Sequence, residues 1–137
     1  MSVKQLAITV TPDADSVAKV RHFVDFAQRV LGPRADRDVV AVLTSELVSN
    51  AVDLGAGEVT VTIRAVEDRL RVEVRDHGFG LPELLHPGPV DPGGGRGLMI
   101  VDELADAWGV QQFLPGKIVW FEIGPVLALQ RRESMPG

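Results

Sequence analysis

The 137-residue chain contains no cysteine and no tyrosine, and only 5% of its residues are aromatic. Without cysteine, disulfide bonds and thiolate metal sites are excluded. Because aromatic residues are scarce, the hydrophobic 45% of the chain must build its core mainly from valine, leucine, isoleucine and alanine. We expect the two tryptophans, Trp108 and Trp120, to pack in that core. The length suits one domain of ordinary size.

The chain also lacks an excess of positive charge and a long apolar run. Its formal net charge is −5 and its pI is about 5.1. A nucleic-acid-binding protein normally carries a basic face that neutralises phosphates, so we expect no nucleic-acid partner. No apolar run approaches the ~20 residues that cross a bilayer, and the N-terminus shows no signal-peptide pattern. We therefore expect a cytoplasmic protein that does not bind a membrane.

Hydrophobic periodicity divides the chain into helices and hairpins. The predicted elements are a strand (6–10), two helices (17–31 and 35–54), a hairpin (59–63 and 70–74), a third helix from Leu98, and a final hairpin (110–113 and 118–123). Helices and hairpins are segregated rather than alternating as βαβ units. This order predicts an α+β fold, a two-layer sandwich in which helices cover one face of a mixed, mainly antiparallel sheet. We expect one domain at 1–124 and a C-terminal tail at 125–137.

Glu46 and Asn50 lie four residues apart on the second predicted helix, so they project from the same face about one turn apart. A carboxylate at this place could activate a hydroxyl group or water, and an amide oxygen could ligate a hard cation such as Mg²⁺. Taken alone, the pair is more typical of a solvated polar strip on an amphipathic helix.

A second motif, Asp76-His77-Gly78-Phe79-Gly80, directly follows a predicted strand. A carboxylate at a strand end could hold a purine amine, and the glycines would let the main chain approach a ligand closely. Taken alone, this motif is more typical of an ordinary Asp/Gly turn.

A third motif, Gly95-Arg96-Gly97-Leu98, closes a long Gly/Pro-rich loop and opens the third helix. The free N–H groups at a helix N-terminus bind phosphate, and Arg96 could add positive charge. A flexible linker is the alternative interpretation of these glycines.

In this order and at these separations, the three motifs resemble those of the GHKL ATPase superfamily. The similarity is to the anti-sigma-factor serine/threonine kinases (HATPase subgroup) found in actinobacteria. Glu46-Leu-Val-Ser-Asn50 looks like the N box, and the motifs at Asp76 and Gly95 look like the two glycine boxes. The resemblance spans roughly residues 6–123 and implies the Bergerat ATP-binding fold.

The resemblance implies ATP and Mg²⁺ as cofactors and gives each motif a role. Asn50 would bind Mg²⁺, Asp76 would accept a hydrogen bond from the adenine amine, and Glu46 would be the catalytic base toward a serine hydroxyl. The nucleotide-binding residues that it implies are Asn50, Asp76, Gly78, Gly80, Gly95, Arg96, Gly97 and Leu98.

The function implied is a protein kinase that phosphorylates a serine of a STAS-domain anti-anti-sigma factor and sequesters a sigma factor. Relatives commonly form homodimers through the first strand and its neighbours.

The sequence departs from the family pattern at Asp53 and Leu54, where many relatives carry a basic residue and histidine. It also departs at Ile118, near which relatives carry a threonine that reaches the adenine site through water. A non-catalytic partner-switching module with weakened or lost ATP binding is therefore the alternative. The catalytic core of a histidine kinase is a third interpretation, which the short chain disfavours.

Overall fold

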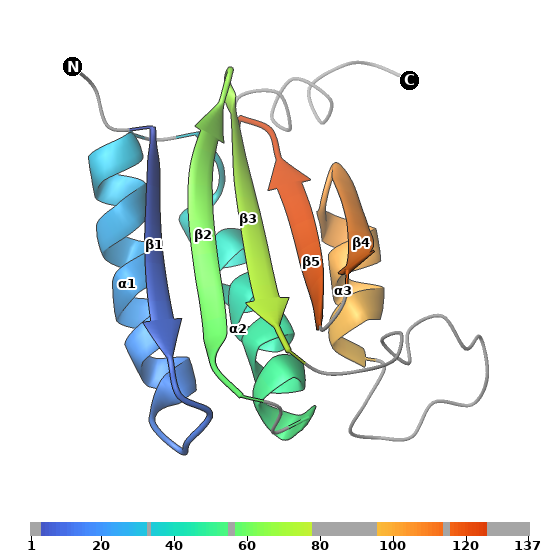
Figure 1. Ribbon diagram of the computed structural model, residues 1–137. Coiled ribbons are helices and arrows are strands. Elements are labelled where there is room, and N and C mark those ends of the chain that lie inside the picture. Colours follow the sequence, from blue (N-terminus) through green and yellow to red (C-terminus); the bar gives the residue numbers. More distant parts are fainter. Residues whose placement is uncertain (1–3, 33, 55–56, 78–95, 114–115, 126–137) are drawn as a thin grey trace.

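A computed structural model describes residues 4–32, 34–54, 57–77, 96–113 and 116–125 of the chain. It contains the predicted helices and strands, with the last hairpin longer than the periodicity indicated (Figure 1). In chain order the elements are β1 (Gln5–Val10), α1 (Ser16–Leu31), α2 (Arg37–Leu54), β2 (Val59–Val66), β3 (Arg69–Asp76), α3 (Arg96–Leu104), β4 (Ala107–Phe113) and β5 (Gly116–Ile123).

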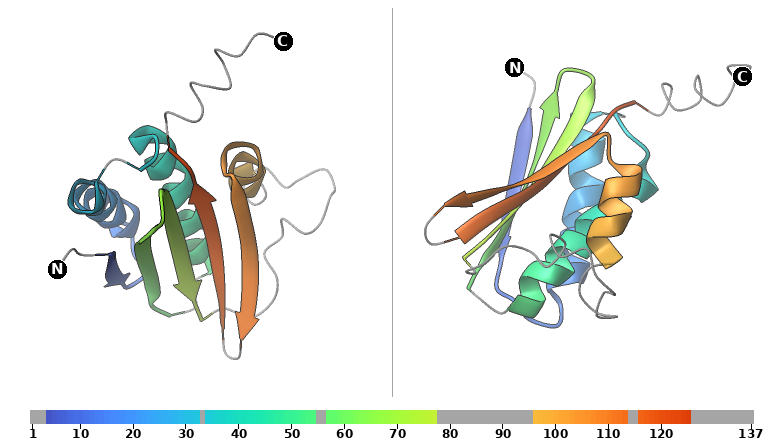
Figure 2. Two further views of the ribbon diagram at one scale, coloured as in Figure 1. Left: turned by 90° about the horizontal axis from the view of Figure 1, so that it is seen from above. Right: turned by 90° about the vertical axis from the view of Figure 1, so that its right-hand side faces the viewer.

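The five strands form one sheet in the order β1-β2-β3-β5-β4, and all four pairings are antiparallel. The three helices lie together against one face of this sheet, and no helix or strand of the described residues covers the other face, the open side of the sheet (Figure 2). The predicted α+β class, with two layers, is confirmed. No helix in the described part of the chain is long and apolar enough to cross a membrane.

The core lies between the sheet and the helices, and side-chain alternation along the strands builds it. In β3, Leu70, Val72 and Val74 are at most 1% exposed, whereas the residues between them face the open side of the sheet. The helices meet this face with apolar residues spaced three or four apart. Among the fully buried members are Val20 and Val24 of α1 and Val40, Leu43 and Val48 of α2.

Trp120 does not pack in the core, so that prediction was wrong. In β5 the buried positions are Lys117, Val119, Phe121 and Ile123, and Trp120 points to the opposite face. There its ring lies 4.1 Å from the guanidinium carbon of Arg71, a cation–π contact. Trp108 is half-buried against the core, as expected, and its Nε1 donates to Asp102.

The start of α2 is fixed by a side-chain cap. The carboxylate of Asp36 accepts hydrogen bonds from the main-chain N–H groups of Asp38 (2.9 Å) and Val39 (3.1 Å). These groups belong to the first turn, where a helix cannot satisfy its own N–H groups. The cap therefore sets the phase of the helix that carries Glu46 and Asn50.

Candidate functional site

The α2 helix positions Glu46 and Asn50 beside the core. Leu43, Leu47 and Ala51 are buried on one stripe of the helix and anchor it to the sheet. Glu46 and Asn50 lie next to that stripe and are both half-buried. The carboxylate of Glu46 makes no hydrogen bond to any residue in the described ranges.

The side-chain amide of Asn50 carries a buried polar atom that lacks a partner. Its Nδ2 atom is shielded from water and has no hydrogen bond within the described part of the chain. An unsatisfied buried donor or acceptor costs about 1–3 kcal/mol, so native proteins contain few of them. The hydroxyl of Thr44, also on α2, is a second such group among the described residues. A ligand that offers an acceptor at this place would satisfy the amide, and the amide oxygen is of the type that ligates Mg²⁺.

Asp76 is the last residue of β3 and is 3% exposed. The antiparallel register sets it directly opposite Lys117 of β5, and both side chains face the helix layer. The Nζ atom of Lys117 lies 3.1 Å from Oδ1 of Asp76, with the two side chains 3% and 4% exposed. The carboxylate that the sequence assigned to a purine amine is thus held in a buried ion pair.

The sequence placed Ile118 near the predicted adenine site, but the residue directly opposite Asp76 is Lys117. Ile118 pairs with Arg75 and therefore faces the open side of the sheet. Sequence reasoning missed Lys117, although a signal was present. Because alternate residues of a strand share one face, the apolar residues Phe121 and Val119 predict that Lys117 lies on the same buried face.

Gly116 allows β5 to begin against the end of β3. A Cβ atom at this position would lie 2.1 Å from the main-chain oxygen of Asp76, closer than any real contact. Only glycine fits such an approach without moving a strand. Gly116 therefore helps to set the position of Lys117 relative to Asp76.

The third predicted motif opens α3, which begins at Arg96 and continues through Gly97 and Leu98. The helix packs against α2. Its N-terminus, the C-terminal end of α2 and the end of β3 lie at the same end of the molecule (Figure 1). Gly78, Gly80 and Gly95 are outside the described residues. The structure thus brings three of the predicted elements to one end of the domain.

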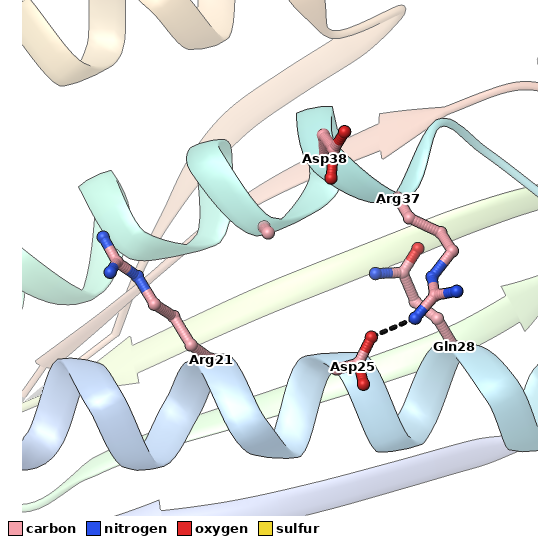
Figure 3. A pocket seen from close by; sticks show the side chains of 6 residues that line it. Arg21, Asp25, Gln28, Arg37 and Asp38 are labelled. Carbon is pink, nitrogen blue, oxygen red and sulfur yellow. Dashed lines mark hydrogen bonds and ion pairs between the residues drawn. The ribbon is translucent and has the colours of Figure 1, made fainter.

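A separate pocket of about 340 Å³ lies between α1 and α2 (Figure 3). Its lining consists of Arg21, Asp25, Gln28, Arg37, Asp38 and Ala41. A hydrogen bond from Arg37 holds the pKa of Asp25 below its ordinary value, with a further contribution from Arg29. Arg21 donates from Nε to the hydroxyl of Ser45 at 3.0 Å. Sequence reasoning did not predict this pocket, and none of the predicted site residues lines it.

Comparisons with known proteins agree with the fold. The structure resembles the crystal structure of the RsbU and RsbW domains of a protein from Mycobacterium tuberculosis, with a TM-score of 0.67 and 19% sequence identity. The similarity covers 90% of this chain and 33% of that one, so the chain spans about a third of its neighbour's length. Among curated proteins, no sequence matches this chain.

A family model matches residues 35–126, from just before α2 to just beyond β5. The matched segment contains both Asn50 and Asp76 and makes up most of the chain. Its description is histidine kinase-, DNA gyrase B- and HSP90-like ATPase. The chain therefore belongs to this GHKL family of ATPases.

Proposed function

We propose that the chain is an ATP-binding regulatory protein that transfers the γ-phosphate of ATP to a serine of a STAS-domain partner and, in alternation, sequesters a sigma factor. One observation carries the proposal. Asp76 is a buried carboxylate at the end of β3, and the Nδ2 atom of Asn50, near the end of α2, has no hydrogen-bond partner among the described residues. The ends of these two elements lie at the same end of a GHKL fold (Figure 1). The neighbour from Mycobacterium tuberculosis, which contains an RsbW domain, supports a regulatory role.

The described residues fit a nucleotide with Mg²⁺. Asn50 would hold Mg²⁺ through its amide oxygen, and Asp76 would accept a hydrogen bond from the adenine amine. The free N–H groups at the start of α3 would bind phosphate oxygens. Mg²⁺ held by Asn50 would neutralise part of the phosphate charge. Glu46, on the same face of α2 as Asn50, would accept the proton of the serine hydroxyl.

The kinase proposal is tested by incubating the protein with labelled ATP, Mg²⁺ and candidate STAS domains. We expect Glu46→Gln to abolish label transfer while ATP binding stays within about threefold, since proton acceptance by a base contributes about 10²–10⁴-fold to rate. Glu67→Gln, in the turn at the opposite end of the sheet, is the matched control. Transfer by Glu46→Gln at the wild-type rate would remove Glu46 from the mechanism.

A second candidate is a partner-switching module without kinase activity and with weakened or lost ATP binding. Negative charge at the C-terminal end of α2, which would repel polyphosphate, favours this second candidate. Asp53 is exposed in the last turn, which contains no basic residue, and the helix dipole adds negative charge there. Calorimetry with ATP, with and without Mg²⁺, separates the candidates. Tight binding without turnover indicates a sensor, and no binding indicates a scaffold.

The same measurement on Asp53→Lys tests the charge argument. Reversing this charge should strengthen ATP binding several-fold at low salt, and the gain should shrink as salt rises. Asp68→Lys, in the distant β2–β3 turn, should change the affinity little.

We also propose a homodimer through the edge of the sheet formed by β1. The β1 strand pairs with β2 on one side, and Leu6 and Ile8 are only half-buried. The α1 helix lies beside β1 (Figure 1), and its exposed apolar residues include Phe26 (57%) and Val30 (41%). Light scattering on Phe26→Asp should show a monomer where the wild type is a dimer. A monomeric wild-type protein would contradict the proposal.

A further inference from the structure

We propose that Lys117 is a second base-reading residue: its ammonium group holds Asp76 and donates a hydrogen bond to the ring nitrogen N1 of the bound adenine. This inference rests on the proposed ATP site and deepens it. Neither the motifs nor the family match assigns a role to Lys117.

The first argument is the burial of the Lys117 ammonium group. Lysine is almost never fully buried unless it is paired, and Lys117, which is 2% exposed, is paired with Asp76. An ammonium group has three N–H donors. Within the described ranges the one acceptor that Lys117 contacts is Oδ1 of Asp76, at 3.1 Å. The remaining donors have no acceptor among the described residues.

The second argument is the position of Lys117. It lies on the core-facing side of β5, directly across from the last residue of β3. The end of β3 and the C-terminal end of α2 lie at the same end of the domain (Figure 1). Four residues before the α2 end, the Nδ2 atom of Asn50 is another buried donor that has no partner in the described part of the chain. Two independent sets of buried donors at one end of the fold point to a ligand that carries acceptors.

The third argument is chemical complementarity. The adenine edge presents an amine donor next to the acceptor N1. Asp76 presents an acceptor, and Lys117, 3.1 Å away, presents donors. An Asp–Lys pair can therefore bind two adjacent positions of the base, whereas a carboxylate alone binds one. If Lys117 only neutralised the charge of Asp76, its contribution to binding would not depend on N1.

The test compares ATP with 1-deaza-ATP, in which a C–H group replaces N1. Calorimetry is done on the wild type, on Lys117→Met, and on the control Lys19→Met, at an exposed position of α1. Because hydrogen bonds to charged groups are strong, we expect the wild type and the control to bind the analogue about tenfold or more weakly than ATP. Lys117→Met should bind the two nucleotides equally.

Any of three results would overturn the inference alone. The first is a wild type that binds ATP and the analogue equally. The second is Lys117→Met that keeps the full discrimination. The third is Lys117→Met that binds ATP more tightly than the wild type, because lysine then competes with the base for Asp76. A wild type that binds neither nucleotide would overturn the proposed ATP site, and the inference with it.

A folding defect is separated from a binding defect by two further variants. Lys117→Arg keeps a cation with several donors and should retain discrimination against the analogue. If Lys117→Met does not fold, the double variant Asp76→Asn/Lys117→Met takes its place, because it leaves no buried charge at this position. It should bind ATP and the analogue with equal affinity. Discrimination that persists in the double variant would refute a contact between Lys117 and N1.

Discussion

Replacing Lys117 by methionine should destabilise the folded protein strongly, because it removes the cation from beside a buried carboxylate. The two side chains are 3% and 4% exposed, and their charged atoms are 3.1 Å apart. Removing one partner of a buried pair costs about 3–5 kcal/mol, compared with about 0–1 kcal/mol for an exposed pair. Methionine preserves the packing of the aliphatic stem, so we expect the lower end of that range, about 3 kcal/mol.

The assay is urea unfolding without nucleotide, followed by far-UV circular dichroism. The urea concentration at the unfolding midpoint should fall, while the m-value, the dependence of the unfolding free energy on urea concentration, should stay constant. The double variant Asp76→Asn/Lys117→Met should be less destabilised than Lys117→Met, because neither charge remains. Arg29→Met is the matched control, since its ion pair with Asp25 is exposed (69% and 45%) and should contribute less than about 1 kcal/mol. A loss below 1 kcal/mol in Lys117→Met would refute the reasoning.

Three further predictions concern other parts of the fold. Gly116→Ala should cost about 3 kcal/mol in urea unfolding, because its Cβ atom would lie 2.1 Å from a main-chain oxygen of β3; an unchanged midpoint would contradict this. Gly109→Ala should cost about 1–2 kcal/mol and alter tryptophan fluorescence, because the added carbon would lie 2.9 Å from the Trp120 ring. Arg37→Gln should raise the pKa of Asp25 toward its ordinary value in an NMR titration, since Arg37 is the main cause of the lowered pKa. The lowered pKa means that this contact stabilises the fold above the ordinary carboxyl pKa and is lost as the pH falls through the lowered value.

The arrangement of helices and strands could be predicted because the hydrophobic period changes sharply along the chain. Valines alternate with threonines in β2, whereas apolar residues recur at intervals of three and four in α1. Glu46 and Asn50 could be placed on one helical face for the same reason. Segregation of helices from hairpins then indicated two layers, which the structure has.

Contacts between strands could not be predicted, because they depend on register. A shift of one residue turns every side chain to the other face of a sheet. The pairing of Asp76 with Lys117 rather than with its neighbour Ile118 follows from that register. Trp120 was misplaced for a different reason: its bulk and apolarity favoured the core, although its alternation with Val119 and Phe121 places it on the other face. Periodicity along single elements also gave no signal for the pocket between α1 and α2, whose lining residues come from both helices.

The measurement that tests the central claim most directly is calorimetric titration of the protein with ATP in the presence of Mg²⁺. We predict saturable binding of one nucleotide per chain, weakened at least tenfold in both Asp76→Asn and Asn50→Ala and unchanged in Glu67→Gln. The loss of a single hydrogen bond to a charged group accounts for an effect of about this size. Absence of nucleotide binding by the wild type, or binding that both site variants retain in full, would contradict an ATP site at this end of the fold.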